Sequence, residues 1–319
     1  MPDPFVSGKV WLNYMYDIIV IGGGPAGLTA AVYALRGGRS VLVIEKNGFG
    51  GQIAYSPKVE NIPGTIQISG AAFADQLVEQ AMNLGADMEL ECVEQIQKEE
   101  NHFIVRTEEG SIFEGSAVIL ALGVKHRMLG LEGEEALIGR GLSFCAVCDG
   151  AFYSGQDAAI IGGGNSALQE ALLLSEVCRK VTVVQNLCDF TGEKKLAEAL
   201  LEKENVDVQF NTVVRHYLQE NGEVTGLELH NTQTDTISQI TVNGVFLAVG
   251  LVPENDAFAS FAKLNQWGYF DSGEDCCTVT PGLFVAGDCR SKRIRQVVTA
   301  AADGAVAATA ACGYLDQIS

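Results

Sequence analysis

The stretch YDIIVIGGGPAGL, residues 16–28, decides the fold of this chain. Residues 16–21 form a short apolar run that predicts a buried strand, glycines follow at once, and residues 28–35 predict a helix. The next apolar run, residues 40–44, ends in Glu45. A strand, a glycine turn, a helix and a second strand make a βαβ unit, which implies a parallel sheet.

The spacing of the glycines in this turn fits the fingerprint of a dinucleotide site. Gly22 makes the tight turn, Gly24 lets the backbone approach a pyrophosphate, and Gly27 lets the helix pack on the strand. The N-terminus of the helix then offers its amides and its dipole to the phosphates. Glu45 is positioned to accept hydrogen bonds from an adenosine ribose. The combination predicts a nucleotide site.

The same architecture returns later in the chain. The turn at residues 162–167, GGGNSA, lies between a predicted strand at 157–161 and a predicted helix at 167–178. The next strand, residues 181–184, ends in Gln185-Asn186-Leu187, which offers neither an acid for a free ribose nor arginines for a 2′-phosphate. Two interpretations stay open: a functional pyridine-nucleotide site, or a retained fold that binds no nucleotide.

The elements between and after the two units predict an α/β fold of two Rossmann-like three-layer domains, the second inserted into the first. We expect residues 15–122 and 251–319 to form one domain and residues 123–250 the other, with hinges near Gly123 and Gly250. Further predicted elements are antiparallel strands around 88–96 and 103–107, strands at 117–122, 206–211, 224–230, 244–249 and 283–288, and an alanine-rich helix at 296–313.

Size and composition limit the class of protein. At 319 residues the chain exceeds the usual size of one core, and its formal charge of −19 argues against nucleic-acid binding. No apolar run approaches the roughly 20 residues that cross a bilayer, and residues 1–13, the start of a segment at 1–14 ahead of the first strand, lack the features of a signal peptide. We interpret those residues as an N-terminal extension or a misassigned start. An odd number of scattered cysteines, nine, indicates a reducing cytoplasm.

The motif Phe144-Cys145-Ala146-Val147-Cys148-Asp149 carries the clearest chemistry. Two residues between cysteines permit a reversible disulfide in which one thiol has a lowered pKa. Zinc would need a second pair of ligands, and the sequence has no other CxxC and no HxxxH, so we expect no metal. Asp149 can supply the proton that disulfide reduction requires, or it caps the following turn.

With these parts in order, the chain resembles the low-molecular-weight thioredoxin reductase family from Tyr16 to the last helix. The resemblance rests on seven blocks in the family's order: Gly22–Gly27, Gly50-Gly51-Gln52, Val59–Gly64, Cys145–Asp149, Gly162–Ala167, Gly287-Asp288 and Arg295-Gln296-Val297.

This resemblance implies a flavoenzyme that binds FAD in the first domain and reduces thioredoxin. Cys148 would be the thiol nearest the flavin, Cys145 the one that attacks thioredoxin, and Asp149 the acid. The inserted domain would swing between the two partners on its hinges, and two chains would pair as a homodimer through their FAD domains. The implied FAD-binding residues are Gly22, Gly24, Pro25, Ala26, Gly27, Glu45, Lys46, Gly51, Gln52, Asn61, Gly123, Asp288 (ribityl chain), Arg295, Gln296 (isoalloxazine end) and Val297.

One departure from the family concerns the electron donor. Members that use NADPH carry a His-Arg-Arg motif and a further Arg, where this chain has Gln185, Asn186, Leu187 and Thr191. Each missing charge-assisted contact removes roughly 1.5–3 kcal/mol, so NADPH is disfavoured. The loss resembles the family's pyridine-nucleotide-independent branch, which takes single electrons from reduced ferredoxin, a transfer that flavin can accept. NADH is the rival donor, supported by the intact turn at 162–167.

Two further questions stay open from the sequence. The basic run Arg290, Lys292, Arg293 and Arg295 would form a docking patch for an acidic ferredoxin, or it is a solvated loop with one flavin contact. The dithiol would also suit a glutaredoxin-like or peroxiredoxin-type partner, and a non-catalytic flavin-binding redox sensor is the alternative outside the enzymes. The cysteine pair argues against a ferredoxin–nicotinamide reductase, which lacks it.

Overall fold

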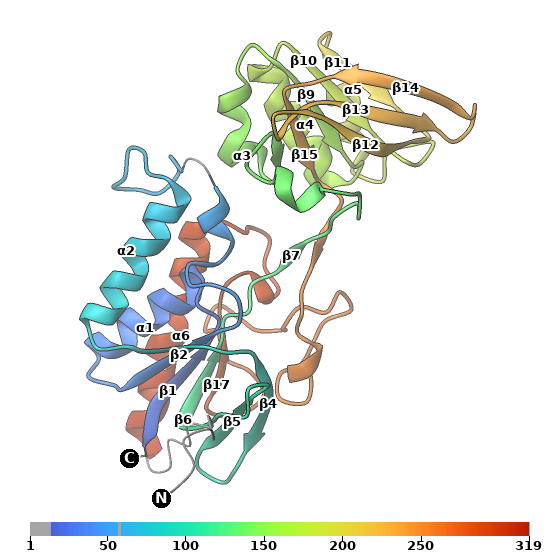
Figure 1. The fold of residues 1–319 in the computed structure, drawn as a ribbon. Coiled ribbons are helices and arrows are strands. Elements are labelled where there is room, and N and C mark those ends of the chain that lie inside the picture. Colours follow the sequence, from blue (N-terminus) through green and yellow to red (C-terminus); the bar gives the residue numbers. More distant parts are fainter. Residues whose placement is uncertain (1–13, 57–58, 319) are drawn as a thin grey trace, which may run out of the picture.

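The computed structural model describes residues 14–56 and 59–318 and consists of two lobes joined by a narrow connection (Figure 1). Thirteen of the fourteen residues of the predicted extension, 1–13, lie outside the described residues. Strands from both ends of the chain build the first lobe, and the segment between them builds the second.

The first lobe contains a seven-stranded sheet in the order β3-β2-β1-β6-β5-β4, with β17 paired to β6. The strands β1, β2, β3, β6 and β17 are parallel, whereas β4 and β5 run antiparallel beside β6. The prediction of antiparallel strands around 88–96 is therefore wrong in part, because β3 pairs parallel to β2. The bounds are β1 (Met15–Ile21), β2 (Val41–Glu45), β3 (Asp87–Leu90), β4 (Val93–Lys98), β5 (Phe103–Thr107), β6 (Ile112–Leu120) and β17 (Leu283–Val285).

Three helices cover one face of this sheet: α1 (Pro25–Arg36), α2 (Gly70–Asn83) and α6 (Val297–Ile318) (Figure 1). Side chains alternate along β1, so Ile18 and Val20 pack with α1 and α6 while Ile19 and Ile21 pack on the opposite face. The helices α1 and α6 approach closely because a Cβ on Gly304 would lie 2.1 Å from the carbonyl oxygen of Ala26.

Helix α6 is the longest helix of the first lobe and bears on the expectation that no segment crosses a membrane. Among the described residues it is the one helix long and apolar enough to cross a membrane by length and composition alone, with 22 residues and a mean hydropathy of 1.2. It lies against α1 and the sheet, with Ala307, Ala308 and Ala311 fully buried there. Its apolar character therefore serves the core of the first lobe.

The second lobe repeats this layering. A parallel sheet in the order β11-β10-β9-β15-β8 lies between α4 and an antiparallel sheet, β12-β13-β14. The antiparallel sheet covers the face opposite α4 with Tyr217, Leu227 and Leu229. The bounds are β8 (Leu142–Ser143), α3 (Ala146–Asp149), β9 (Asp157–Ile161), α4 (Asn165–Val177), β10 (Lys180–Val184), α5 (Lys194–Leu201), β11 (Val206–Gln209), β12 (Thr212–Glu220), β13 (Glu223–Asn231), β14 (Thr236–Thr241) and β15 (Gly244–Leu247).

The connection between the lobes is a two-stranded antiparallel ribbon of β7 (Lys125–His126) and β16 (Leu251–Val252). Gly123 and Gly250 precede these strands with φ angles of 65° and 109°, a region that favours glycine. A Cβ at either position would meet no atom within 4 Å, so backbone conformation and not crowding requires glycine there. The remaining short 3₁₀ helices are η1 (Gly51–Tyr55), η2 (Glu134–Leu137), η3 (Gly150–Tyr153), η4 (Asp256–Phe258) and η5 (Gly287–Cys289).

Candidate functional site

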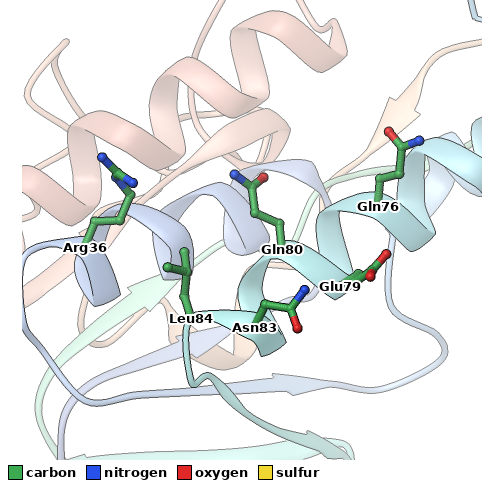
Figure 2. Close-up of a pocket in the computed structure, with 6 residues that line it drawn as sticks. All are labelled: Arg36, Gln76, Glu79, Gln80, Asn83 and Leu84. Atoms are coloured by element: carbon green, nitrogen blue, oxygen red, sulfur yellow. The ribbon is translucent and has the colours of Figure 1, made fainter.

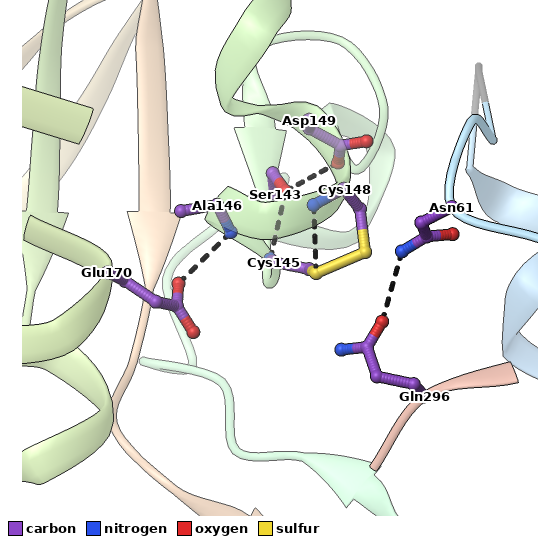
Figure 3. Close-up of a disulfide and its surroundings, with 8 residues drawn as sticks. All are labelled: Asn61, Ser143, Cys145, Ala146, Cys148, Asp149, Glu170 and Gln296. Carbon is purple, nitrogen blue, oxygen red and sulfur yellow. Dashed lines mark hydrogen bonds between the residues drawn. A yellow bond between two sulfur atoms is a disulfide. The ribbon is translucent and has the colours of Figure 1, made fainter. Parts of the chain in front are cut away.

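Cys145 and Cys148 form a disulfide at the start of α3, with 5.3 Å between their Cα atoms (Figure 3). The peptide N–H of Cys148 donates a hydrogen bond to Cys145 Sγ at 3.2 Å. The N–H of Ala146 instead donates to Glu170 on α4, at 3.2 Å. The two-residue spacing thus gives a closed loop that is held by hydrogen bonds within the motif and by bonds to Ser143 and to Glu170 on α4.

Asp149 lies beside the disulfide as a partly buried carboxyl group (Figure 3). Its Oδ2 accepts a hydrogen bond of 2.6 Å from the hydroxyl of Ser143, and its Oδ1 is buried without a hydrogen-bond partner among the described residues. Burial raises the pKa of Asp149, opposed by hydrogen bonds from Ser143 and Ser56. Because a raised pKa keeps the carboxyl group protonated to higher pH, Asp149 is suited to donate a proton.

Ser56, which influences the pKa of Asp149, directly follows η1 and belongs to the first lobe. Figure 3 shows Cys148 on the side of the pair that faces Asn61 and Gln296. Asn61 Nδ2 donates a hydrogen bond of 3.1 Å to Gln296 Oε1, which joins two segments far apart in the sequence. The structure therefore gathers one cysteine and two of the predicted flavin-binding residues in one place.

The first glycine turn has the conformation that its spacing predicts. Gly22 has a φ of 107°, and a Cβ there would lie 2.3 Å from the carbonyl oxygen of Ala121. A Cβ on Gly27 would lie 1.8 Å from the carbonyl oxygen of Gly22. Glu45 Oε2 accepts a hydrogen bond of 2.7 Å from the N–H of Gly23, which fixes the acid beside the turn.

A second glycine loop closes over the first. The N–H of Gly50 donates to the carbonyl oxygen of Gly23 at 2.7 Å, and a Cβ on Gly51 would lie 3.0 Å from the Cα of Gly24. Pro25 begins α1, and Ala26 is buried behind it. The turn therefore presents backbone without side chains, together with the N-terminus of α1, beside Glu45. A pyrophosphate binds to a surface of this kind.

Asp288 provides an independent test of the fit to FAD. Its Oδ1 is buried and accepts no hydrogen bond from the described residues, although Lys292 Nζ lies 3.9 Å away. Burial raises the pKa of this carboxyl group, partly offset by Lys292 and Arg295. A buried acceptor without a donor matches the hydroxyl groups of a ribityl chain. The residues present fit FAD.

Other predicted flavin-binding residues contact protein groups in this structure. Lys46 forms an ion pair of 2.7 Å with Glu254, which also pairs with Lys125 at 2.7 Å. Gln52 donates a hydrogen bond to the carbonyl oxygen of Val124. These contacts tie the first lobe to the chain beside the ribbon, and no pattern in the sequence pointed to Glu254.

The basic run near the C-terminus is only partly a surface feature, which corrects the docking-patch hypothesis. Arg290 binds both carboxylate oxygens of Asp303, each at 2.8 Å, and Lys292 binds Asp303 at 2.9 Å. The side chains of Arg290 and Lys292 are 11% and 9% exposed. Arg295 lies 4.3 Å from the centre of the Tyr269 ring. Of these four cations, Arg293 is the exposed one.

Asp303 is a functional-site residue that sequence reasoning missed. It also accepts a hydrogen bond of 3.1 Å from the N–H of Gly287, so it fixes the loop that presents Asp288. The signal was available: a single acid interrupts the alanine-rich stretch of α6, where an unpaired carboxylate would be costly.

The second glycine turn is covered by its own loop. The side chain of Gln185 is 3% exposed, and a Cβ on Gly163 would lie 2.3 Å from its Nε2. Gln185 donates to the carbonyl oxygen of Asp189 at 3.0 Å, and the N–H groups of Thr191 and Gly192 both donate to Gly163. The segment 185–192 contains no Lys, Arg or His. It therefore offers no positive charge to a 2′-phosphate.

Other surface features carry no comparable chemistry. Figure 2 shows a shallow hollow between α1 and α2. Arg36, which lines it, is the last residue of α1 and lies at the opposite end of that helix from the glycine turn. Its lining residues are Arg36, Gln76, Glu79, Gln80, Asn83 and Leu84. Within residues 14–56 and 59–318, no three or more His, Cys, Asp and Glu side chains gather as a metal site.

Comparisons with known proteins identify the family of this chain. The family model described as pyridine nucleotide-disulphide oxidoreductase matches residues 16–304, which defines the class: an FAD-binding disulfide oxidoreductase. A Bacillus subtilis thioredoxin reductase is 36% identical over 304 residues, covering 95% of this chain and 96% of the relative. The chain belongs to the low-molecular-weight thioredoxin reductase family of enzymes.

Two solved structures extend the comparison. A Streptococcus pyogenes thioredoxin reductase superposes with a TM-score of 0.89 at 36% identity, covering 96% of this chain and 99% of that one. A Lactococcus lactis thioredoxin reductase in the FR conformation gives 0.67 at 31% identity, covering 95% and 99%. Both support the expected fold of two dinucleotide-type domains.

Proposed function

We propose that this enzyme reduces thioredoxin through the Cys145–Cys148 pair, with electrons that reach FAD from reduced ferredoxin and not from NADPH. The observation that carries the first half is the Cys145–Cys148 disulfide with the partly buried carboxyl group of Asp149 beside it, on the side of the second lobe where Cys148 faces Asn61 and Gln296 (Figure 3). The thioredoxin reductases among its relatives support thioredoxin as the substrate.

FAD, when bound, supplies a ring that accepts electrons singly and delivers them in pairs. Two reduced ferredoxins and two protons convert the Cys145–Cys148 disulfide to a dithiol and leave two oxidised ferredoxins. The Cys145 thiolate then attacks the disulfide of thioredoxin, and Cys148 resolves the mixed disulfide, which restores the Cys145–Cys148 bond and releases reduced thioredoxin. We assign to Asp149 the protonation of the Cys148 sulfur in the first of these steps, when the Cys145–Cys148 disulfide is reduced to the dithiol.

The choice of donor is supported by Gln185 and its loop. Where a nucleotide-using relative would need cations, this chain has a buried amide bound to Asp189 and no positive charge from 185 to 192. NADH avoids the need for a phosphate site, so it is the competing donor. The correction to the basic run leaves Arg293, among those four, as a docking cation, so ferredoxin must be recognised over a wider surface.

We further propose that residues 15–122 and 251–319 form the FAD-binding domain and that residues 123–250 form the inserted domain. The sheet topology and the left-handed glycines at 123 and 250 support this division and a swing of the second lobe. The difference in superposition between the two solved relatives supports more than one orientation of the lobes. A cytoplasmic homodimer is the assembly expected from the family.

The donor is tested by mixing the oxidised holoenzyme anaerobically with reduced ferredoxin, NADH or NADPH and following the flavin absorbance. Reduced ferredoxin should bleach the flavin, and thioredoxin should restore the colour. Rapid bleaching by micromolar NADPH would remove the donor proposal. Failure of thioredoxin to restore the colour would remove the substrate proposal, in favour of a glutaredoxin-like or peroxiredoxin-type partner.

A further inference from the structure

Glu170 is a carboxyl group next to the disulfide to which the reaction described above gives no part. It lies on α4, in the second lobe, and accepts the hydrogen bond from the N–H of Ala146, at 3.2 Å. Ala146 directly follows Cys145 and is 2% exposed. Figure 3 shows the carboxyl group of Glu170 on the Cys145 side of the pair, whereas Asp149 lies nearer Cys148.

We propose that Glu170 is a positioning residue for Cys145: it fixes the Cys145–Ala146 peptide from α4, and its charge controls how readily Cys145 forms a thiolate. This proposal deepens the reductase function and rests on it. In this proposal Asp149 acts on the sulfur of Cys148, and Glu170 acts on the sulfur of Cys145.

The hydrogen bonds explain why the charge of Glu170 matters to Cys145. A thiolate at the first cysteine of a CxxC motif is stabilised by nearby peptide N–H groups. Here the N–H of Cys148 donates to Cys145 Sγ, but the N–H of Ala146 is already bound by Glu170. An anionic Glu170 therefore withdraws one donor and adds a like charge. Both effects oppose the Cys145 thiolate.

The surroundings of Glu170 make its charge responsive near neutral pH. Burial raises its pKa to about 7, and the hydrogen bond from Ala146 opposes that rise. No charged side chain is among the causes of the shift. The titratable and charged groups on the elements packed against α4 are Cys145, Cys148 and Asp149 at α3, Tyr153 on η3, Lys194, Lys195 and Glu198 on α5, Asp157 on β9 and Lys180 on β10.

The sign of the effect follows from these observations. Below pH about 6, Glu170 is protonated in most molecules, and its replacement by glutamine changes little. Above pH 7 it is anionic in the wild-type enzyme and neutral in Glu170→Gln. The pKa of the Cys145 thiol should then be lower in the variant by roughly one unit, the usual size of a neighbouring like charge.

The test measures the alkylation rate of Cys145 by iodoacetamide in dithiothreitol-reduced holoenzyme from pH 5 to 9. Fragment-ion mass spectrometry separates the label on Cys145 from that on Cys148. Glu170→Gln should be alkylated about three to ten times faster than the wild type near pH 8, with the difference vanishing below pH about 6. Glu176→Gln, the same change on α4 in a side chain paired with Lys203, is the matched control and should follow the wild type.

A second variant separates the charge from a purely mechanical role. Glu170→Ala removes the acceptor as well as the charge, so it should show the faster alkylation above pH 7 and also a slower turnover with thioredoxin. Coincident alkylation profiles of wild type and Glu170→Gln would overturn the proposal, whatever Glu170→Ala does. The alkylation assay needs neither electron donor nor thioredoxin, so a failure of the proposed function would be seen separately.

Discussion

The two glycine turns of this chain have similar backbone conformations and differ in the residue at the carboxyl end of the following strand, Glu45 as the last residue of β2 and Gln185 directly after β10. In both, the first glycine has a positive φ, 107° at Gly22 and 134° at Gly162, and in both a Cβ there would strike a carbonyl oxygen of the neighbouring strand. In both, a returning loop donates N–H groups to the carbonyl oxygen of the second glycine. The backbone of the turn is therefore similar whether an acid or an amide stands at the end of the following strand.

The difference lies at the carboxyl ends of β2 and β10. Glu45 directs a carboxylate at the first turn and accepts the N–H of Gly23. Gln185 occupies the corresponding place at the second turn, but its amide is buried and donates to Asp189 in its own loop. At the first turn this position thus holds a carboxylate, and at the second turn it holds an amide that closes the loop.

The largest expected effect comes from exchanging the third small residue of each turn. Gly27→Ala should yield colourless protein, because its Cβ would lie 1.8 Å from the carbonyl oxygen of Gly22 and would displace the turn. Ala167→Gly, the reciprocal change, should keep its flavin. Flavin absorbance per polypeptide after purification is the measurement. Gly27→Ala with a full complement of FAD would show that the first turn does not hold the cofactor.

Restoring positive charge to the second turn should have the next largest effect. The triple change Asn186→Arg, Leu187→Arg and Thr191→Arg should lower the NADPH concentration that bleaches the flavin by roughly a hundredfold or more, since each charge-assisted contact contributes about 1.5–3 kcal/mol. The control carries glutamine at the same three positions. Equal responses of the two variants would mean that the closed loop, and not the missing charge, excludes NADPH.

The smallest effect is expected from exchanging the strand-end residues. Glu45→Gln should weaken FAD binding about tenfold, because a neutral acceptor replaces a charged one at the ribose and at Gly23. Gln185→Glu should instead lower the melting temperature with unchanged flavin content, because a carboxylate cannot donate to Asp189. Flavin titration and thermal unfolding separate the two outcomes. A loss of FAD affinity in Gln185→Glu would contradict the comparison.

The regular elements near the two turns were predictable, and those far from them were less so. Strand β9 begins and ends where the sequence predicted, because apolar runs next to a glycine turn have few alternatives. Helix α2 and strands β12 and β14 were missed, since they lack both a turn motif and a strong apolar run. Strand β3 was assigned the wrong pairing because direction depends on the partner strand, which the local pattern does not name.

The residues of the candidate site also fall into two groups, those that the sequence could identify and those that it could not. The CxxC pair and Asp149 could be named from their adjacency in sequence. The partners that govern them could not, because Glu170 on α4 and Ser56 in the other lobe approach only after folding. The basic run shows the opposite error: four cations close together suggested a surface patch, but Asp303 holds two of them inside the first lobe.

The sequence by itself determined the two βαβ units, the redox-active cysteine pair, the family and the absence of a basic nucleotide motif, because each depends on residues close together in the chain. Tertiary structure alone decided which carboxyl groups flank the disulfide and which cations are free. Those outcomes depend on burial and on contacts between distant segments, which set both the pKa values and the ion pairs.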